Sequence, residues 1–138
     1  MAIGQVYLDQ GDYRQRALDM LGACYGYHLS DQPVLFKPTR AAKIPFRGEL
    51  SGALSYFVGG DDQYPEDHGF ALDAWSKVTF RNHNFICQQH MGLVMGEYLF
   101  SKPGQQDALV EYTFGYVQDS KGELKIVLHH SSFPAKGA

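Results

Sequence analysis

The sequence predicts an α+β protein in which N-terminal helices cover one face of a strongly curved, mainly antiparallel sheet. In two segments of the first sixty residues, apolar side chains recur at three- and four-residue spacing, as amphipathic helices require. From about residue 74 onward, apolar and polar residues alternate instead, which is typical of half-buried strands. A chain with its helices first and its strands afterwards favours separate helix and sheet layers.

The size and composition fit a single domain, which we expect to cover residues 1–138. Hydrophobic residues make up 44% of the chain and charged residues 20%, as in ordinary globular proteins. No apolar run approaches the about 18 residues of a membrane-spanning helix, and charged residues come too early for a signal peptide. The net charge of -3 and the scattered basic residues argue against nucleic acid as a partner. We therefore expect a cytoplasmic protein that binds neither membrane nor nucleic acid.

The first two elements are a helix and a short strand. The helix is expected over residues 5–28, where the apolar spacing is helical. The strand is VLFK, residues 34–37, which Pro38 ends. Thr39 therefore lies where the chain leaves the core, at the start of the irregular segment TRAAKIP.

A second helix is expected within GELSGALSYFVGG, residues 48–60. Leu50 and Leu54 share one helical face, Tyr56 lies on or near that face, and two glycines end the element. The polar segment 61–73, which contains Pro and Gly, indicates a loop.

Four strands complete the expected fold, joined most simply as an antiparallel meander. Turn clusters such as KPGQQ and QDSKGE separate the alternating segments. The four segments are AWSKVTFRN (74–82), CQQHMGLVMGEYLFS (87–101), ALVEYTFGYVQ (108–118) and ELKIVLHHSSF (123–133).

The HHSS run in the last strand is the most informative polar feature. Successive side chains of a strand point to opposite faces, so His129 shares a face with Ser131, and His130 shares the other with Ser132. The two adjacent histidines cannot both bind one metal, and the remaining histidines show no metal-binding spacing. We expect no metal cofactor, although manganese or zinc stays open.

A serine nucleophile is not favoured either. His129 is two residues from Ser131, about 7 Å along the strand, which is too far for direct proton transfer without a bridging water. No G-x-S-x-G turn surrounds the serines. The run is better explained as part of a pocket wall with satisfied hydrogen bonds or a bound ligand.

A curved sheet covered by helices encloses an interior that suits a small ligand. We expect the lining to combine hydroxyls with the apolar side chains of Leu35, Val94, Phe114 and Val127. This composition fits a small neutral substrate, and the chain has no glycine-rich phosphate loop.

The cysteines and three basic residues give weaker signals. Cys24 and Cys87 form no C-x-x-C pair and are expected to be buried free thiols. Lys37 and Arg40 flank Thr39 and could attract an anion, but isolated basic residues beside a turn are usually solvated, and Arg47 is a similar case.

Five motifs, in this order, closely resemble the iota-class carbonic anhydrases, a family with the cone-shaped NTF2-like, SnoaL-like fold. The resemblance covers about residues 28–134, and LFKPT and ALSYFVGG together with HHSS make it specific. The motifs are VLFKPT, GALSYFVGG, EDHGFAL, VEYTFGYVQD and LKIVLHHSSFP.

The resemblance implies reversible hydration of CO2 to bicarbonate and a proton, by a homodimer and without metal, although some diatom members are described as manganese-dependent. It implies a hydroxyl cluster of Thr39, Tyr56 and one serine of HHSS. We favour Ser131, paired with His129, as the catalytic serine. We also assign substrate binding to His130 and Ser132, with a structural role for His130 as the alternative.

The proton acceptor is a separate hypothesis, because a metal-free site lacks a zinc-bound water of low pKa. Either Tyr56 with a lowered pKa or His129 acting through a water would serve as the base. Thr39 as a brace of its loop and Tyr56 as a core aromatic remain structural alternatives.

Two rival functions stay open. One is an isomerase or cyclase of the ketosteroid-isomerase or polyketide-cyclase kind, which needs Glu97 or Glu111 as a base inside the cone. The other is a non-catalytic binding or association module.

Overall fold

The computed structural model describes residues 2–29, 32–73 and 75–136. Its helices and strands follow the expected order, except that two helices replace the first predicted one and a short 3-10 helix ends the predicted loop 61–73. They are α1 (Ile3–Leu8), α2 (Tyr13–Cys24), β1 (Leu35–Lys37), α3 (Leu50–Val58), the short 3-10 helix η1 (Phe70–Asp73), β2 (Lys77–Gln88), β3 (Met91–Ser101), β4 (Ala108–Gln118) and β5 (Leu124–Ser132).

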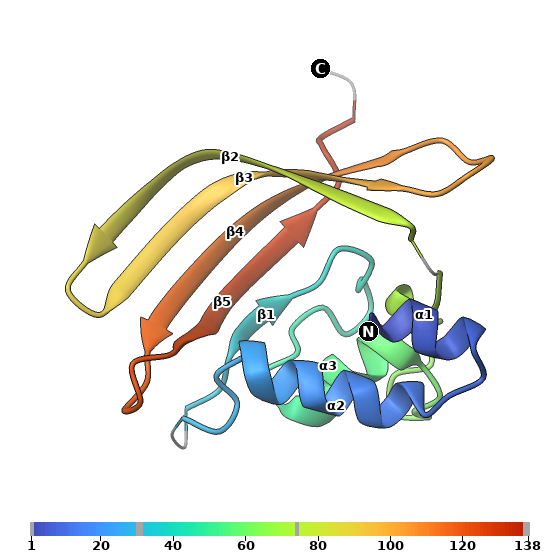
Figure 1. The fold of residues 1–138 in the computed structure, drawn as a ribbon, viewed down its shortest axis with the longest axis horizontal. Helices are drawn as coiled ribbons and strands as arrows, with labels where there is room; N and C mark the ends of the chain where they lie inside the picture. The colour runs from blue at the N-terminus through green and yellow to red at the C-terminus, as the bar shows by residue number, and fades with distance from the viewer. Residues whose placement is uncertain (1, 30–31, 74, 137–138) are drawn as a thin grey trace.

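The strands form one curved sheet in the order β1-β5-β4-β3-β2. Strands β2 to β5 are an antiparallel meander, as predicted, whereas β1 adds to the far edge parallel to β5. Figure 1 shows the sheet arching over α1, α2 and α3, which lie together on one side of it. The α+β prediction, with helices on one face of a mainly antiparallel sheet, is therefore confirmed.

The helix predicted over residues 5–28 is wrong in its extent, because the chain forms two helices there. Gln10 adopts a positive φ of 59°, which ends α1. The Asp12 carboxylate then accepts a hydrogen bond from the Gln15 amide and caps the start of α2. The apolar spacing behind the prediction lies at residues 17–28, after this break, so it did not report where the helix begins.

The boundary between the first two predicted meander strands is also wrong. Strand β2 runs on to Gln88, and the hairpin turns at Gln89, whose φ is 28°, and His90. A bulge between Asn82 and Asn84 shifts the side-chain alternation within β2 and hides its continuity from a period-two pattern. Ala74, the first residue of the predicted strand, lies outside the described residues.

The core lies between the helices and the concave face of the sheet. Ala17 and Leu21 of α2 and Ala53 of α3 are fully buried, and they pack in one cluster with Phe36 and Val110. This cluster fixes the positions of β1, which ends just before Thr39, and α3, which carries Tyr56. None of the helices within the described ranges is long and apolar enough to cross a membrane.

Both cysteines depart from expectation, because Cys24 and Cys87 are exposed. Cys24 is the last residue of α2, and Cys87 lies near the end of β2, where the helices do not cover the sheet.

Candidate active site

Strand β5 turns its two His–Ser pairs to opposite faces, as the sequence predicts. His129 and Ser131 face the helices and are 8% and 1% exposed. His130 is exposed and Ser132 half-buried on the convex face. Ser131, rather than Ser132, therefore belongs to the interior.

Ser131 and His129 are hydrogen-bonded directly, which corrects the expectation that a water must bridge them. The Ser131 Oγ lies 2.8 Å from His129 Nε2 and 2.7 Å from the Tyr98 hydroxyl. The backbone spacing of about 7 Å still holds, but the two side chains lean toward each other along the strand.

Thr39 links this group to Tyr56. Its side chain faces the hydroxyls of Tyr98 and Tyr56 and opposes the rise that burial causes in the pKa of both tyrosines, and the Tyr56 hydroxyl accepts a hydrogen bond of 3.3 Å from the Arg40 amide. Thr39, Tyr56 and Ser131 thus meet around Tyr98, although three different elements supply them. We call these four residues with His129 the hydroxyl cluster.

Sequence reasoning missed two members of this network, Tyr98 and Tyr25. Tyr98 is buried on β3, and its hydroxyl joins Ser131 to Thr39. Tyr25 follows α2 and places its hydroxyl 2.7 Å from His129 Nδ1. The alternation of β3 puts Tyr98 on the same face as Phe100, which is a usable signal, but no pattern in the sequence points to Tyr25.

Aromatic rings hold His129 in one plane. The rings of Phe114 and Phe36 stack on its imidazole with centroids 4.1 and 4.9 Å away. These rings come from β4 and β1, the two strands that pair with β5 at this position. The imidazole is therefore enclosed by apolar faces and fixed at both nitrogens.

Burial governs the acid-base properties of the cluster. It raises the pKa of Tyr56 to about 12, although hydrogen bonds from the Arg40 amide and with Thr39 oppose the rise. This contradicts the hypothesis of a lowered Tyr56 pKa. Burial, with a smaller effect of nearby His130, lowers the pKa of His129 to about 3, so the imidazole is neutral at physiological pH.

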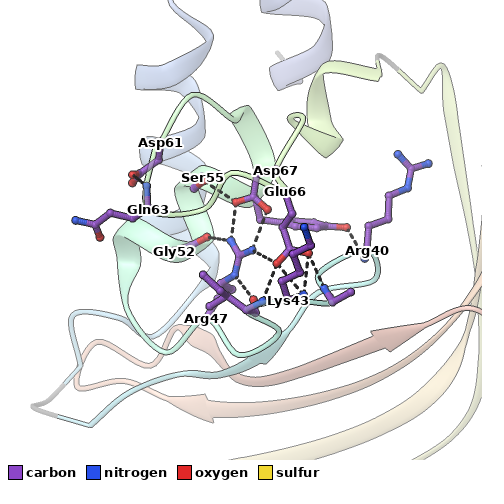
Figure 2. A network of polar contacts seen from close by, with 12 residues as sticks. Arg40, Lys43, Arg47, Gly52, Ser55, Asp61, Gln63, Glu66 and Asp67 are labelled. Carbon is purple, nitrogen blue, oxygen red and sulfur yellow. Dashed lines mark hydrogen bonds and ion pairs between the residues drawn. The ribbon is translucent and has the colours of Figure 1, made fainter.

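Arg47 was expected to be a solvated surface residue, and this prediction is wrong. Its side chain lies at the centre of a buried network (Figure 2). It is 1% exposed and forms two hydrogen bonds with the Asp67 carboxylate, of 2.7 and 2.8 Å. It also donates to the carbonyls of Ile44 and Gly52, and the Ser55 hydroxyl donates to Asp67. Full pairing of this kind is what a buried guanidinium requires.

Glu66 extends this network to the segment after Thr39. Its carboxylate accepts hydrogen bonds from the three consecutive amides of residues 42–44 and lies 3.7 Å from Arg47. The network therefore ties the segment after Thr39 to the helix that carries Tyr56. A cavity of about 50 Å³ lies beside Tyr56, between Arg40 and residues 66–70.

The two other basic residues lie near Thr39 but make different contacts. Lys37 is half-buried on β1 and donates to the carbonyls of Thr39 and Ser131, at 3.5 and 3.4 Å. Arg40 is exposed and pairs with Asp73 at 2.8 Å. Neither side chain donates to a hydroxyl of the cluster within the described ranges.

The convex face holds the remaining candidate residues. Glu97 pairs there with Arg81, and the exposed Glu111 lies beside Ser132. His130 and Ser132 share this face, so the sheet separates them from the hydroxyl cluster. The carboxylate base that an isomerase or cyclase needs inside the cone is not supplied by either glutamate.

The expected apolar lining is partly right. Phe114 is buried on the concave face and Val94 is half-buried there, and both line a cavity of about 680 Å³. Val127 is half-buried beside Gly26. Leu35 was assigned wrongly, because it is 64% exposed and pairs with Leu128 on the convex face.

Metal-ligating side chains do not gather in the described part of the chain. Across residues 2–29, 32–73 and 75–136, no group of three His, Cys, Asp or Glu side chains could hold a metal ion.

Comparison with known proteins identifies relatives along almost the whole chain. A curated relative, the metal-independent carbonic anhydrase of Nostoc sp., is 37% identical over 137 residues. This match covers 97% of the present chain and 66% of the relative, so the chain spans slightly less than two thirds of that protein.

Solved structures agree with this relationship. The crystal structure of a cyanobacterial iota-carbonic anhydrase complexed with bicarbonate matches with a TM-score of 0.92 and 35% identity, covering 98% of this chain and 83% of that one. A putative calcium/calmodulin-dependent protein kinase II association domain from Xanthomonas campestris matches with a TM-score of 0.55 and 16% identity, covering 96% and 86%, and shares the fold alone. The family model described as metal-independent carbonic anhydrase matches residues 1–133. The chain therefore belongs to the metal-independent carbonic anhydrase family.

Proposed function

We propose that this chain catalyses the reversible hydration of CO2 to bicarbonate and a proton, without a metal cofactor. The observation that carries the proposal is the meeting of the Thr39, Tyr56 and Ser131 side chains around Tyr98. The same three residues lie in the LFKPT, ALSYFVGG and HHSS motifs, which resemble those of the iota-class carbonic anhydrases. The names of the relatives, and the bicarbonate in the matching crystal structure, support the same reaction.

The cluster has the chemistry that this reaction needs. Carbon dioxide is apolar and bicarbonate is a small anion, so a site for both needs dry walls and hydrogen-bond donors facing the oxygens that gain charge. Phe36, Phe114 and the ring of Tyr56 provide apolar surface. The hydroxyls of Thr39, Tyr56 and Ser131 provide the polar groups.

Tyr56 acts as a donor in this proposal, and not as the base. With its pKa raised to about 12, the phenol keeps its proton at neutral pH and can share it with an oxygen of the substrate. Thr39 orients Tyr56 and the attacking water. Ser131, held between His129 and Tyr98, anchors the Tyr98 hydroxyl beside Thr39.

Stopped-flow CO2 hydration with chelator-treated protein tests the proposal. Thr39→Ala and Tyr56→Phe should each lower kcat by about 100- to 1000-fold, the range for losing one hydrogen-bond donor that stabilises developing charge. Tyr7→Phe, which removes an exposed hydroxyl far from the cluster, is the matched control and should leave the rate unchanged.

Each other outcome has a definite meaning. Unchanged turnover in Tyr56→Phe would remove Tyr56 from the mechanism. Activity that is lost on chelation and restored by manganese or zinc would contradict the metal-free reaction. A folded protein with no turnover would favour a binding or association module instead.

We also propose that residues 1–138 form one domain of the NTF2-like kind, and that two copies pair through the convex faces of their sheets. A row of apolar residues supports this pairing, because it crosses all five strands in register on that face. The row consists of Leu35, Leu128, Gly115, Leu93 and Ile86. A cytoplasmic location stays a proposal that cell fractionation tests.

A further inference from the structure

The hydroxyl cluster continues inward to Tyr25, and the direction of its hydrogen bonds decides what it offers to a ligand. The contacts run from Tyr25 to His129, then to Ser131, Tyr98 and Thr39. Each hydroxyl has one proton to donate, so such a chain has two opposite orders. In one order the protons point toward Thr39, and in the other they point toward Tyr25.

The Tyr25 end fixes the order. Tyr25 is 5% exposed, and within the described ranges His129 Nδ1 is the hydrogen-bond partner of its hydroxyl, at 2.7 Å. Burial raises the pKa of Tyr25 well above its ordinary value, so the phenol keeps its proton. A buried hydroxyl proton without an acceptor is costly, so Tyr25 donates to Nδ1.

Donation from Tyr25 fixes the direction of the next hydrogen bonds in turn. His129 is neutral because its pKa lies at about 3, and a neutral imidazole carries one N–H. Since Nδ1 accepts from Tyr25, the proton lies on Nε2 and is donated to Ser131 Oγ, 2.8 Å away. Ser131 therefore donates to Tyr98, at 2.7 Å, which leaves the Tyr98 proton to point toward the Thr39 side chain that it faces.

We propose that Tyr25 is a positioning residue that holds His129 as the Nε2–H tautomer and thereby turns the hydroxyl protons of the cluster toward Thr39 and Tyr56. The site then presents donors to an anion such as bicarbonate. His129 is then a donor to Ser131 and takes no proton from the attacking water. Solvent must accept that proton instead. The catalytic consequence rests on the proposed function, but the tautomer does not.

The tautomer can be measured on the wild-type protein without any turnover. In protein labelled with 15N-histidine, the nitrogen shifts and proton couplings distinguish a protonated from an unprotonated ring nitrogen. His129→Gln identifies the signals of His129 by their loss. We expect a protonated Nε2 and an unprotonated Nδ1 at pH 7. A protonated Nδ1 would overturn the proposal.

Tyr25→Phe tests the consequence, with Tyr27→Phe as the matched control. Tyr27 stacks on Tyr25, but its hydroxyl donates to the Arg47 carbonyl and takes no part in the hydrogen bonds that run from Tyr25 to Thr39. Tyr25→Phe should shift the His129 signals to a tautomer mixture and weaken bicarbonate binding by about tenfold, the effect of losing one oriented hydrogen bond. Tyr27→Phe should change neither.

The remaining outcomes separate the two proposals. Equal losses in Tyr25→Phe and Tyr27→Phe would show a merely structural role and overturn the inference. A wild-type protein with the expected tautomer but no CO2 hydration would overturn the proposed function and leave the tautomer assignment in place. If Tyr25→Phe does not fold, the wild-type tautomer alone decides.

Discussion

At the residue scale, Arg47 shows how a buried charge is made tolerable. Its guanidinium is shielded from water, and so is the Asp67 carboxylate that it binds twice. Removing one partner of such a pair leaves the other charge buried and unpaired, which costs about 3–5 kcal/mol. Arg47→Met should therefore lower the free energy of unfolding by that amount in urea denaturation.

The matched control for this prediction is Arg40→Met. Arg40 also pairs with an aspartate at 2.8 Å, but the two side chains are 45% and 41% exposed. Exposed pairs contribute about 0–1 kcal/mol, so this variant should stay close to the wild type. Similar losses in both variants would contradict the importance of burial at Arg47.

The contrast between these arginines also shows what the sequence could not supply. Arg40 and Arg47 look alike along the chain, since both are single basic residues in an irregular segment. What separates them is Asp67, which folding brings against Arg47 from a segment distant in the sequence. Residue type and local sequence pattern therefore could not predict that Arg47 pairs with Asp67.

At the scale of elements, Glu66 joins the segment 42–44 to the network, and this gives the stability a pH dependence. The hydrogen bonds from the Ile44 and Ala42 amides are the main cause that lowers the Glu66 pKa from 4.5 to about 2. A carboxylate with a depressed folded pKa stabilises the fold above its unfolded pKa, and this contribution is lost as the pH falls toward the folded pKa.

Glu66→Gln should therefore flatten the acid limb of the stability curve. Between about pH 4.5 and pH 2, the free energy of unfolding of the wild type should fall more steeply than that of the variant, by up to about 1.4 kcal/mol per pH unit. Urea denaturation at several pH values measures both slopes. Identical slopes would show that Glu66 has the same pKa in the folded and unfolded chains.

Strand β3 has a glycine where the sheet leaves no space for a side chain. A Cβ at Gly96 would lie 2.6 Å from the Tyr112 hydroxyl and 2.8 Å from the Asn82 Cα, at the bulge of β2. Gly96→Ala should lower the free energy of unfolding by about 1–3 kcal/mol, because backbone and a buried ring must shift. Thermal denaturation measures the effect.

Gly92, on the same strand and the same face, is the control. Its nearest neighbour would be the Ile86 carbonyl oxygen at 3.9 Å, an ordinary contact. Gly92→Ala should be neutral or stabilising by up to about 1 kcal/mol, since it restricts the unfolded chain. A destabilisation equal to that of Gly96→Ala would refute the steric explanation.

At the scale of the whole molecule, the sequence predicted the layers better than their edges. Alternation put Ser131 with His129 on one face of the strand and Ser132 with His130 on the other, but only the structure shows that the Ser131 face is buried. The parallel pairing of β1 with β5 escaped prediction, because a three-residue strand carries too little pattern to name its partner. That pairing brings Phe36 against His129 and begins the segment that leads to Thr39.

The convex face of the sheet carries the apolar row through which we propose that two copies of the chain pair. Ile86 and Leu35 are 60% and 64% exposed at the ends of the apolar row, and the side chains of Leu93 and Leu128 lie over Gly115 between them. Exposed apolar surface of this continuity favours association. Ile86→Glu should therefore convert the proposed dimer to a monomer in sedimentation-velocity experiments.

Phe85→Glu is the control for this variant, because Phe85 is the neighbouring residue, is 65% exposed, and faces the concave side with Val94. The two variants add the same charge at nearly the same exposure on opposite faces of one strand. A dimer that survives Phe85→Glu and dissociates with Ile86→Glu pairs through its convex face. The reverse result would place the contact on the concave side, and a wild-type monomer would rule out both arrangements.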